Sequence, residues 1–177
     1  MFFCRVFVLI LSVLATACVV CANLFDVFRR DIGGGSTKQT LWYSKATVGS
    51  GIKDLVRDSL CNEYKLFFQI SEGVAVGGAA IGFIVLILAI VRLFMGRGSC
   101  FLRCFILFLT SAAFAGCGAC VGLLVFGYMQ GYCQNDDSLR DAYAPFKDRG
   151  YEFVEGFYLI CVACGLFLFV NFFQCCA

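Results

Sequence analysis

Four long stretches without charged residues alternate with mixed, more polar segments along this chain. They comprise residues 6–25, 73–91, 104–129 and 156–177. A helix rising about 1.5 Å per residue needs about 20 residues to cross a hydrocarbon core about 30 Å thick, and each stretch has that length. The runs are uniformly apolar, without the alternation expected of membrane barrel strands. The pattern therefore predicts four membrane-spanning helices.

These helices predict an all-α membrane protein, a four-transmembrane-helix bundle with a small β-containing extracellular region. We expect a single domain, 1–177, whose spans and loops alternate in the order 5–25, 26–72, 73–95, 96–103, 104–129, 130–154 and 155–177. A cleaved signal peptide is the rival interpretation of the first run, because Arg5 precedes an apolar centre and the small residues Ala15 and Ala17. The length of that run favours a retained helix.

The first loop contains signals for local structure. Gly33–Gly35 predicts a turn, and Gln39–Thr47, rich in Thr, Trp and Tyr, predicts a strand. We expect Trp42 to fill the core of this small sheet, because a lone aromatic side chain in such a sheet usually packs. Apolar residues on one helical face predict a short amphipathic helix: Ile52, Leu55, Val56 and Leu60.

Composition narrows the class of protein. Hydrophobic residues make up 61% of the chain and charged residues 15%, against about 45–50% and about 25% in soluble proteins. With a net charge of +2, these values exclude an ordinary soluble domain, a disordered chain and a nucleic-acid binder. Histidine is absent, which excludes His-ligated metal sites and His general bases. We predict no enzyme, no cofactor and no metal site.

Loop charge predicts the orientation. The loop 92–103 carries Arg92, Arg97 and Arg103 and no acid, whereas loop 130–154 is rich in Asp and Glu. The positive-inside rule places the arginine loop and both termini in the cytoplasm. Loop 26–72 is then extracellular, although its seven Lys and Arg residues, mixed with six acids, weaken the asymmetry. No Asn-x-Ser/Thr sequon occurs, so N-glycosylation is not expected.

Thirteen cysteines are distributed over the spans and loops. Under this topology Cys61 and Cys133 are the two in the extracellular loops, next to the ends of the second and third spans. We expect an oxidising exterior to join them, the alternative being two free thiols. Cysteines at the cytoplasmic boundary are candidates for S-palmitoylation, with reduced thiols as the alternative: Cys100, Cys104, Cys175 and Cys176.

Three CxxC pairs fall within predicted helices, at Cys18/Cys21, Cys117/Cys120 and Cys161/Cys164. Residues i and i+3 share a helix face, so a pair could perform thiol–disulfide exchange. A reactive thiolate needs a cationic or helix-terminal setting, which these apolar helices do not supply. We therefore interpret these cysteines as small packing residues.

Small residues indicate where the helices meet, because lipid provides no hydrophobic drive for helix association. The second span contains two small-xxx-small series and the third contains one: Gly73 and Gly77, Gly78 and Gly82, and Gly118 and Gly122. The natural inference is a tight contact between the second and third helices through these glycines.

Part of the first loop matches a family signature. The signature consists of a cysteine, three further residues, the pair Trp-Gly, and a second cysteine six residues after the Trp. Thr40-Leu41-Trp42 matches the core of this signature, and Lys45 and Thr47 are residue types that it allows. With its four spans, loop lengths and cysteine placement, the chain resembles the amastins, small four-span surface proteins of kinetoplastid parasites with claudin-like architecture.

The chain also departs from this motif. Lys38 and Val48 occupy the two cysteine positions and Tyr43 the glycine position. The joint loss implies that the two signature cysteines normally pair with each other, which leaves Cys61 and Cys133 as a second, retained pair. The claudin-like architecture implies a small sheet of outer-loop strands above a left-handed four-helix bundle.

The resemblance implies a non-enzymatic multi-pass surface protein of the plasma membrane that acts through its extracellular loops in adhesion, surface organisation or host contact. The expected partners are the lipid bilayer and either a second copy of the chain or a host surface, with no nucleic acid. A membrane thiol–disulfide oxidoreductase that uses the intramembrane CxxC pairs and an oligomeric pore are the alternatives.

Overall fold

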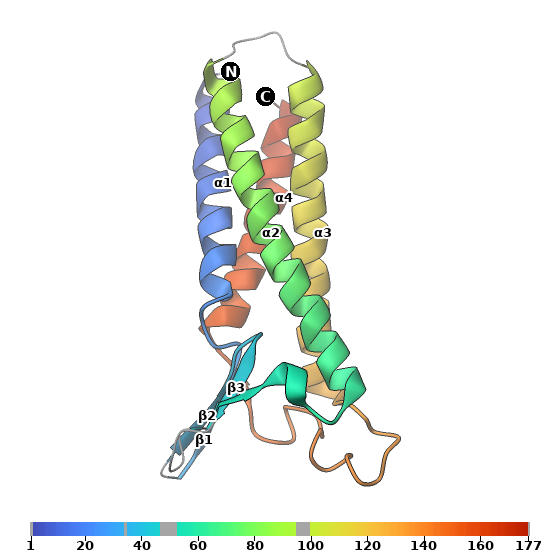
Figure 1. Cartoon of the computed structure of the whole chain (residues 1–177). Coiled ribbons are helices and arrows are strands. Elements are labelled where there is room, and N and C mark those ends of the chain that lie inside the picture. Colours follow the sequence, from blue (N-terminus) through green and yellow to red (C-terminus); the bar gives the residue numbers. More distant parts are fainter. Residues whose placement is uncertain (1, 34, 47–52, 95–99, 177) are drawn as a thin grey trace.

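The structure, a computed structural model, describes residues 2–33, 35–46, 53–94 and 100–176. Within these ranges the long helices are α1 Phe2–Ala22, α2 Asn62–Phe94, α3 Cys100–Gln130 and α4 Glu155–Cys176. Figure 1 shows one bundle with a sheet at one end and both chain termini at the other. All four helices are long and apolar enough to cross a membrane. The predicted four-helix architecture is therefore confirmed.

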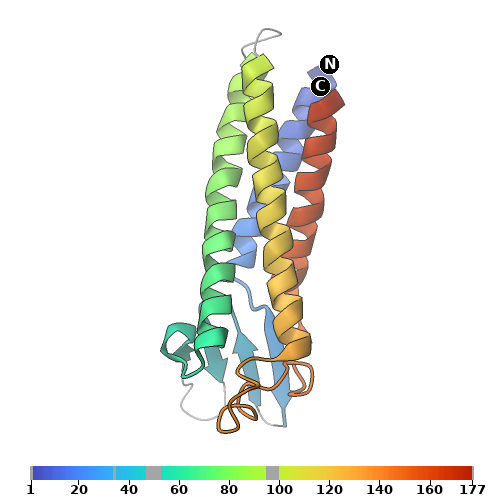
Figure 2. The same ribbon diagram turned by 90° about the vertical axis from the view of Figure 1, so that its right-hand side faces the viewer.

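The helices form a closed ring. Each packs against the next along the chain, and α4 packs against α1. Two views show that α2 and α3 extend further toward the sheet than α1 and α4 do (Figures 1 and 2). α2 begins at Asn62, so the end of the first loop is already helical before the predicted span at 73–95, and α3 ends where Gly131 adopts a left-handed φ of 72°. The two extended helix ends therefore stand beside the sheet.

A repeat of alternating three- and four-residue steps runs along the inward face of every helix. In α2 the buried positions are Tyr64, Phe68, Ser71, Ala75, Gly78, Gly82, Val85, Ala89 and Arg92. The same spacing marks Val8, Ser12, Ala15, Val19 and Ala22 in α1, and Ile106, Thr110, Ala113, Cys117, Cys120 and Leu124 in α3. It also marks Ile160, Ala163, Phe167, Val170 and Gln174 in α4. This set, which we call the seam, has the 3.5-residue period of helices that coil around one another.

The predicted glycines do not make the contact between α2 and α3. A Cβ atom added at Gly78 would lie 3.7 Å from Val19, and one at Gly82 would lie 2.7 Å from the Thr16 hydroxyl oxygen, so these two glycines pack against α1. An added Cβ at Gly73, Gly77, Gly118 or Gly122 would meet nothing within 4 Å. The prediction was wrong because these four glycines lie off the seam. On α3 the close approach to α2 is at Gly116, whose added Cβ would lie 3.3 Å from Val74.

The sheet contains five antiparallel strands in the order β4-β3-β2-β1-β5. The strands are β1 Phe28–Ile32, β2 Gly35–Gln39, β3 Tyr43–Ala46, β4 Lys53–Leu55 and β5 Glu152–Phe153. The first loop contributes four of them, and β5 from the second loop pairs with β1. β1 and β2 pair from Phe28↔Gln39 to Ile32↔Gly35, so the chain reverses within the predicted glycine turn. The sheet thus joins both loops at one end of the bundle.

Two predictions for the first loop were wrong in detail. The strand predicted at 39–47 is interrupted, because the Thr40 hydroxyl oxygen accepts hydrogen bonds from the N–H groups of Trp42 and Tyr43 and turns the chain. The predicted amphipathic helix is instead β4 followed by the short 3₁₀ helix η1, Val56–Asp58. Pairing of β4 with β3 outweighs the helical periodicity there. Ile52 lies outside the described residues.

We predict that Gly82→Val lowers the free energy of unfolding by about 1–3 kcal/mol, the cost of overpacking a tight contact. Gly77→Val is the matched control, since it places the same side chain on the same helix in open space. Thermal unfolding of the two purified proteins in one detergent measures the difference. Equal midpoints for the two variants would contradict the packing of Gly82 against Thr16.

Candidate surface site in the head

A disulfide ties the helix ends beside the sheet. Cys61 immediately precedes α2 and Cys133 follows α3, and their sulfur atoms are 2.01 Å apart. A second link lies next to it, because the backbone N–H of Cys133 donates to the Glu63 carboxylate at 2.7 Å. The structure therefore brings together the two cysteines predicted for the extracellular loops. We call the sheet, η1 and segment 131–151 the head.

An aromatic cluster holds the two loops on the bundle. The Phe28 ring of β1 stacks on Phe146 of the second loop with centroids 4.5 Å apart. The Tyr64 ring of α2 lies 4.6 Å from that of Phe68 and 5.3 Å from that of Tyr132. Burial raises the pKa of Tyr132, which keeps its hydroxyl protonated. These contacts make the head a continuation of the bundle core.

The signature residues form the turn between β2 and β3. Leu41 is 0% exposed and Thr40 is 1% exposed, whereas Trp42 is 37% exposed. The apolar plug of the sheet is therefore Leu41, and the expectation that Trp42 fills this core was wrong. The Thr40 hydrogen bonds turn the chain so that Leu41 enters the core while Trp42 remains at the surface. Trp42 borders a groove of about 560 Å³, which is also lined by Gln69, Glu72 and Val76 of α2.

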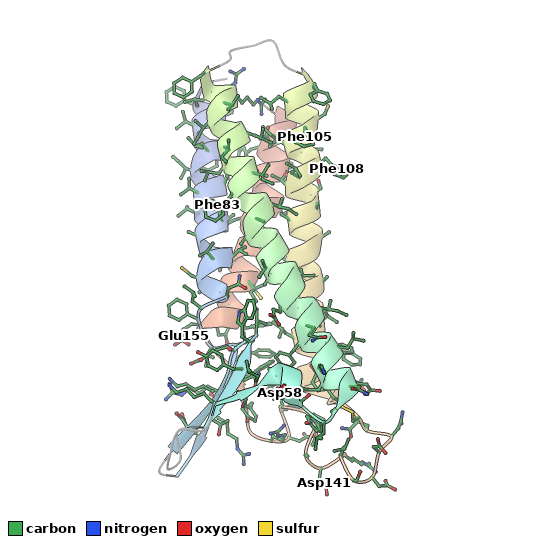
Figure 3. The ribbon with its side chains drawn as sticks, in the orientation of Figure 1. Asp58, Phe83, Phe105, Phe108, Asp141 and Glu155 are labelled. Atoms are coloured by element: carbon green, nitrogen blue, oxygen red, sulfur yellow. A yellow bond between two sulfur atoms is a disulfide. The ribbon has the colours of Figure 1, made fainter. Side chains whose placement is uncertain are left out.

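A second pocket of about 400 Å³ opens between the two loops. Its lining includes opposite charges, Asp58 from η1 and Arg149 from the second loop, and the aromatic residues Tyr64, Tyr143 and Tyr151. The Arg149 guanidinium carbon lies 5.3 Å from the Tyr151 ring centroid, which orients the charge over an aromatic face. Figure 3 shows Asp58, Asp141 and Glu155 at this end, and Phe83, Phe105 and Phe108 along the bundle. One charge of each sign and three tyrosine rings thus line the same pocket.

No motif in the sequence indicates this pocket. Asp58 and Arg149 are far apart in the chain, and neither belongs to a motif. Among the described residues, no group of three or more His, Cys, Asp or Glu side chains could hold a metal ion. The chemistry available in the pocket is recognition, through one cation, one carboxylate and several tyrosine faces.

The remaining described cysteines lie in the bundle. Cys117 and Cys120 are buried in the seam, where Cys120 lies 3.9 Å from the Ser71 carbonyl oxygen and Cys164 lies 3.9 Å from that of Phe114. Cys104 is exposed, and its S-palmitoylation stays a prediction, as does that of Cys100. The side chains of Cys175 and Cys176 lie outside the described part of the structure, as does that of Cys100.

Four apolar helices that carry a disulfide-tied β head define a small four-span membrane protein. Residues 4–173, nearly the whole chain, match the sequence pattern of the Amastin surface glycoprotein family. The chain therefore belongs to this family. The resemblance proposed from Thr40-Leu41-Trp42 is confirmed. A comparison with curated proteins finds no match.

We predict that Leu41→Ala lowers the free energy of unfolding by about 2–5 kcal/mol, because it leaves a cavity in the core of the head. Leu60→Ala is the matched control, since Leu60 is 81% exposed. Trp42 is the single tryptophan of the chain, so its fluorescence during denaturation reports on the head. If Leu60→Ala shifts the midpoint as much as Leu41→Ala does, the assignment of Leu41 as the plug is wrong.

We also predict that the double variant Cys61→Ser, Cys133→Ser loses about 2–4 kcal/mol of stability, because the bridge restricts the unfolded chain. Cys104→Ser, which removes an exposed free thiol, should leave the denaturation midpoint unchanged. The same Trp42 fluorescence assay, run with and without reductant, measures both effects. A double variant as stable as the unreduced protein would show that the bridge contributes nothing.

Proposed function

We propose that this chain is a non-enzymatic cell-surface protein that acts through its head in adhesion or surface organisation, including contact with a host surface. The observation that carries the proposal is the form of the head. Its two loops are held by one disulfide, one sheet and one aromatic cluster, and they present an open pocket with Arg149 and Asp58 on its lining. A pre-organised surface of this kind is suited to binding, because little ordering is needed on contact.

The distribution of charge supports an outward head. Acidic residues occur in both loops of the head, whereas loop 92–103 at the other end carries three arginines and no acid. By the positive-inside rule we place the arginine end in the cytoplasm, together with both termini, and the head outside. The family of surface glycoproteins supports the plasma membrane as the location. A disulfide in the head agrees with an oxidising exterior.

The arrangement of the thiols supports a non-enzymatic role. Exchange through Cys161 and Cys164 would require a partner thiol near the membrane boundary, and the two cysteines of the head are bonded to each other. The CxxC residues of α3 occupy seam positions, where a small apolar side chain is needed for packing.

We predict that Arg149→Gln reduces head-mediated adhesion about tenfold, the effect of losing about 1.4 kcal/mol at a contact hot spot. The assay uses vesicles that carry the purified full chain, counted after binding to cultured mammalian cells and to vesicles that carry the same protein. Arg140→Gln is the matched control, because it removes the same charge from an exposed position outside the pocket.

Two outcomes would contradict the proposal. Adhesion of wild-type vesicles no greater than that of protein-free vesicles would overturn the adhesive role. Equal loss in Arg149→Gln and Arg140→Gln would show that net charge acts rather than the pocket. Thermal unfolding of each variant, measured in parallel, separates a binding defect from a folding defect.

A further inference from the structure

The seam ends in polar residues at the end of the bundle opposite the head. Arg92 of α2 is 8% exposed, and Gln174 of α4 is 0% exposed. An Arg92 guanidinium N–H donates a hydrogen bond to the Gln174 side-chain oxygen. The amide nitrogen of Gln174 is buried and has no hydrogen-bond partner among the described residues. A buried donor without an acceptor is costly, so this pair is incomplete.

Two more arginines join this pair from the other two helices. The positive charges of Arg5 on α1 and Arg103 on α3 are near enough to Arg92 to act on it repulsively. The Nε atom of Arg5 is buried and has no hydrogen-bond partner within the described part of the chain. Each of the four helices therefore contributes one side chain with N–H donors to this group. We call these side chains the arginine cluster: Arg5, Arg92, Arg103 and Gln174.

Among the described residues, no carboxylate side chain is available to neutralise Arg5 and Arg92. The sequence contains no Asp or Glu in residues 1–25, 73–135 or 156–177, so the last acidic residue of α2 before Arg92 is Glu72. The acidic residues labelled in Figure 3, Asp58, Asp141 and Glu155, lie at the opposite end of the bundle. Partly buried positive charges near a membrane, such as those of Arg5 and Arg92, are unfavourable unless an anion accompanies them.

The depth of the cluster indicates the source of that anion. Phe3, Phe94 and Phe101 are 86%, 81% and 81% exposed on the bundle, as expected for side chains that face lipid. Each arginine of the cluster lies two residues further into the bundle than one of these phenylalanines. The arginines are therefore at or below the level of the lipid boundary, where the nearest anions are phospholipid headgroups.

We propose that the arginine cluster is a binding site for the phosphate group of an anionic phospholipid. Phosphate oxygens accept hydrogen bonds from guanidinium groups with favourable bidentate geometry, and one phosphate can accept from several donors at once. It would supply acceptors for Arg5 Nε and for the Gln174 amide, and it would reduce the repulsion among the three arginines. Arg5 and Arg103 are half-buried, so they form the mouth through which a headgroup approaches Arg92.

Orientation alone does not account for this arrangement. The positive-inside rule requires arginines near the helix ends, and exposed arginines on the outer faces would satisfy it. Arg92 instead occupies a seam position and contacts a residue of α4. The inference is independent of what the head binds, because the two sites lie at opposite ends of the molecule.

The test measures lipid retention and stability of the full-length protein. Wild type, Arg92→Gln and the charge-matched control Arg140→Gln are reconstituted in phosphatidylcholine nanodiscs with and without phosphatidylglycerol. Native mass spectrometry counts bound phosphatidylglycerol, and thermal unfolding gives the stabilisation by this lipid. We expect phosphatidylglycerol to raise the midpoint of wild type and of Arg140→Gln, and its apparent affinity for Arg92→Gln to fall about tenfold or more.

Further arms decide the source of the phosphate and guard against misfolding. Inorganic phosphate added to phosphatidylcholine nanodiscs should give no comparable stabilisation, and an equal effect would overturn the assignment to a lipid. Equal phosphatidylglycerol retention by wild type and Arg92→Gln would overturn the site. If Arg92→Gln does not fold, Arg5→Gln carries the test, because Arg5 lies at the mouth, and unchanged lipid retention in that variant would equally overturn the proposal.

Discussion

Close approach of four helices along one repeating seam is the constraint on which this structure depends. Lipid tails are as apolar as the side chains they would replace, so helix association in a membrane relies on packing and on interhelical hydrogen bonds. The seam meets that requirement with small residues such as Ala15, Ala75, Gly82, Ala113 and Ala163, while Phe, Ile and Leu side chains face outward. The seam also buries a few large side chains, such as Phe68, Phe167 and Ile106. The bundle is therefore held together by the fit of small and large side chains, with many other large apolar side chains directed toward lipid.

The seam also determines where the head sits. α1 ends at the level where α4 begins. There the backbone N–H of Gly156 donates to the Asp26 carbonyl oxygen at 2.9 Å. A Cβ at Gly156 would lie 2.6 Å from that oxygen, so the start of α4 requires glycine for this contact. Val154 donates to the Val27 carbonyl oxygen at 3.1 Å, which adds β5 to the sheet. The sheet is thus attached through hydrogen bonds near the ends of α1 and α4, while the disulfide joins α2 and α3 beside it.

Length and apolarity were sufficient to predict the four helices, because a membrane span is defined by those two properties. They were not sufficient to predict which side of each helix packs, since core and lipid-facing positions are both apolar and no amphipathic pattern arises. The 3.5-residue recurrence of small residues such as Ala75, Gly78 and Gly82 was the usable signal. In the head, the turn at Thr40 depends on a side-chain hydrogen bond, and the pocket between Asp58 and Arg149 depends on tertiary contact alone.

The polar residues of the seam differ between its middle and its far end. Hydroxyl groups in the bundle donate hydrogen bonds to backbone carbonyl oxygens of their own helices. The Thr16 hydroxyl donates to the Ser12 carbonyl oxygen at 2.7 Å, and the Ser71 hydroxyl donates to the Phe67 carbonyl oxygen at 2.9 Å. Such groups can be buried in lipid without an external partner. Arg92 and Gln174 satisfy each other only in part, at a level where a phospholipid headgroup is within reach. Two of the three buried side-chain polar atoms without a partner among the described residues, Arg5 Nε and Gln174 Nε2, therefore lie at the end that a headgroup could complete, and the third is Asn23 Oδ1 at the head end of α1.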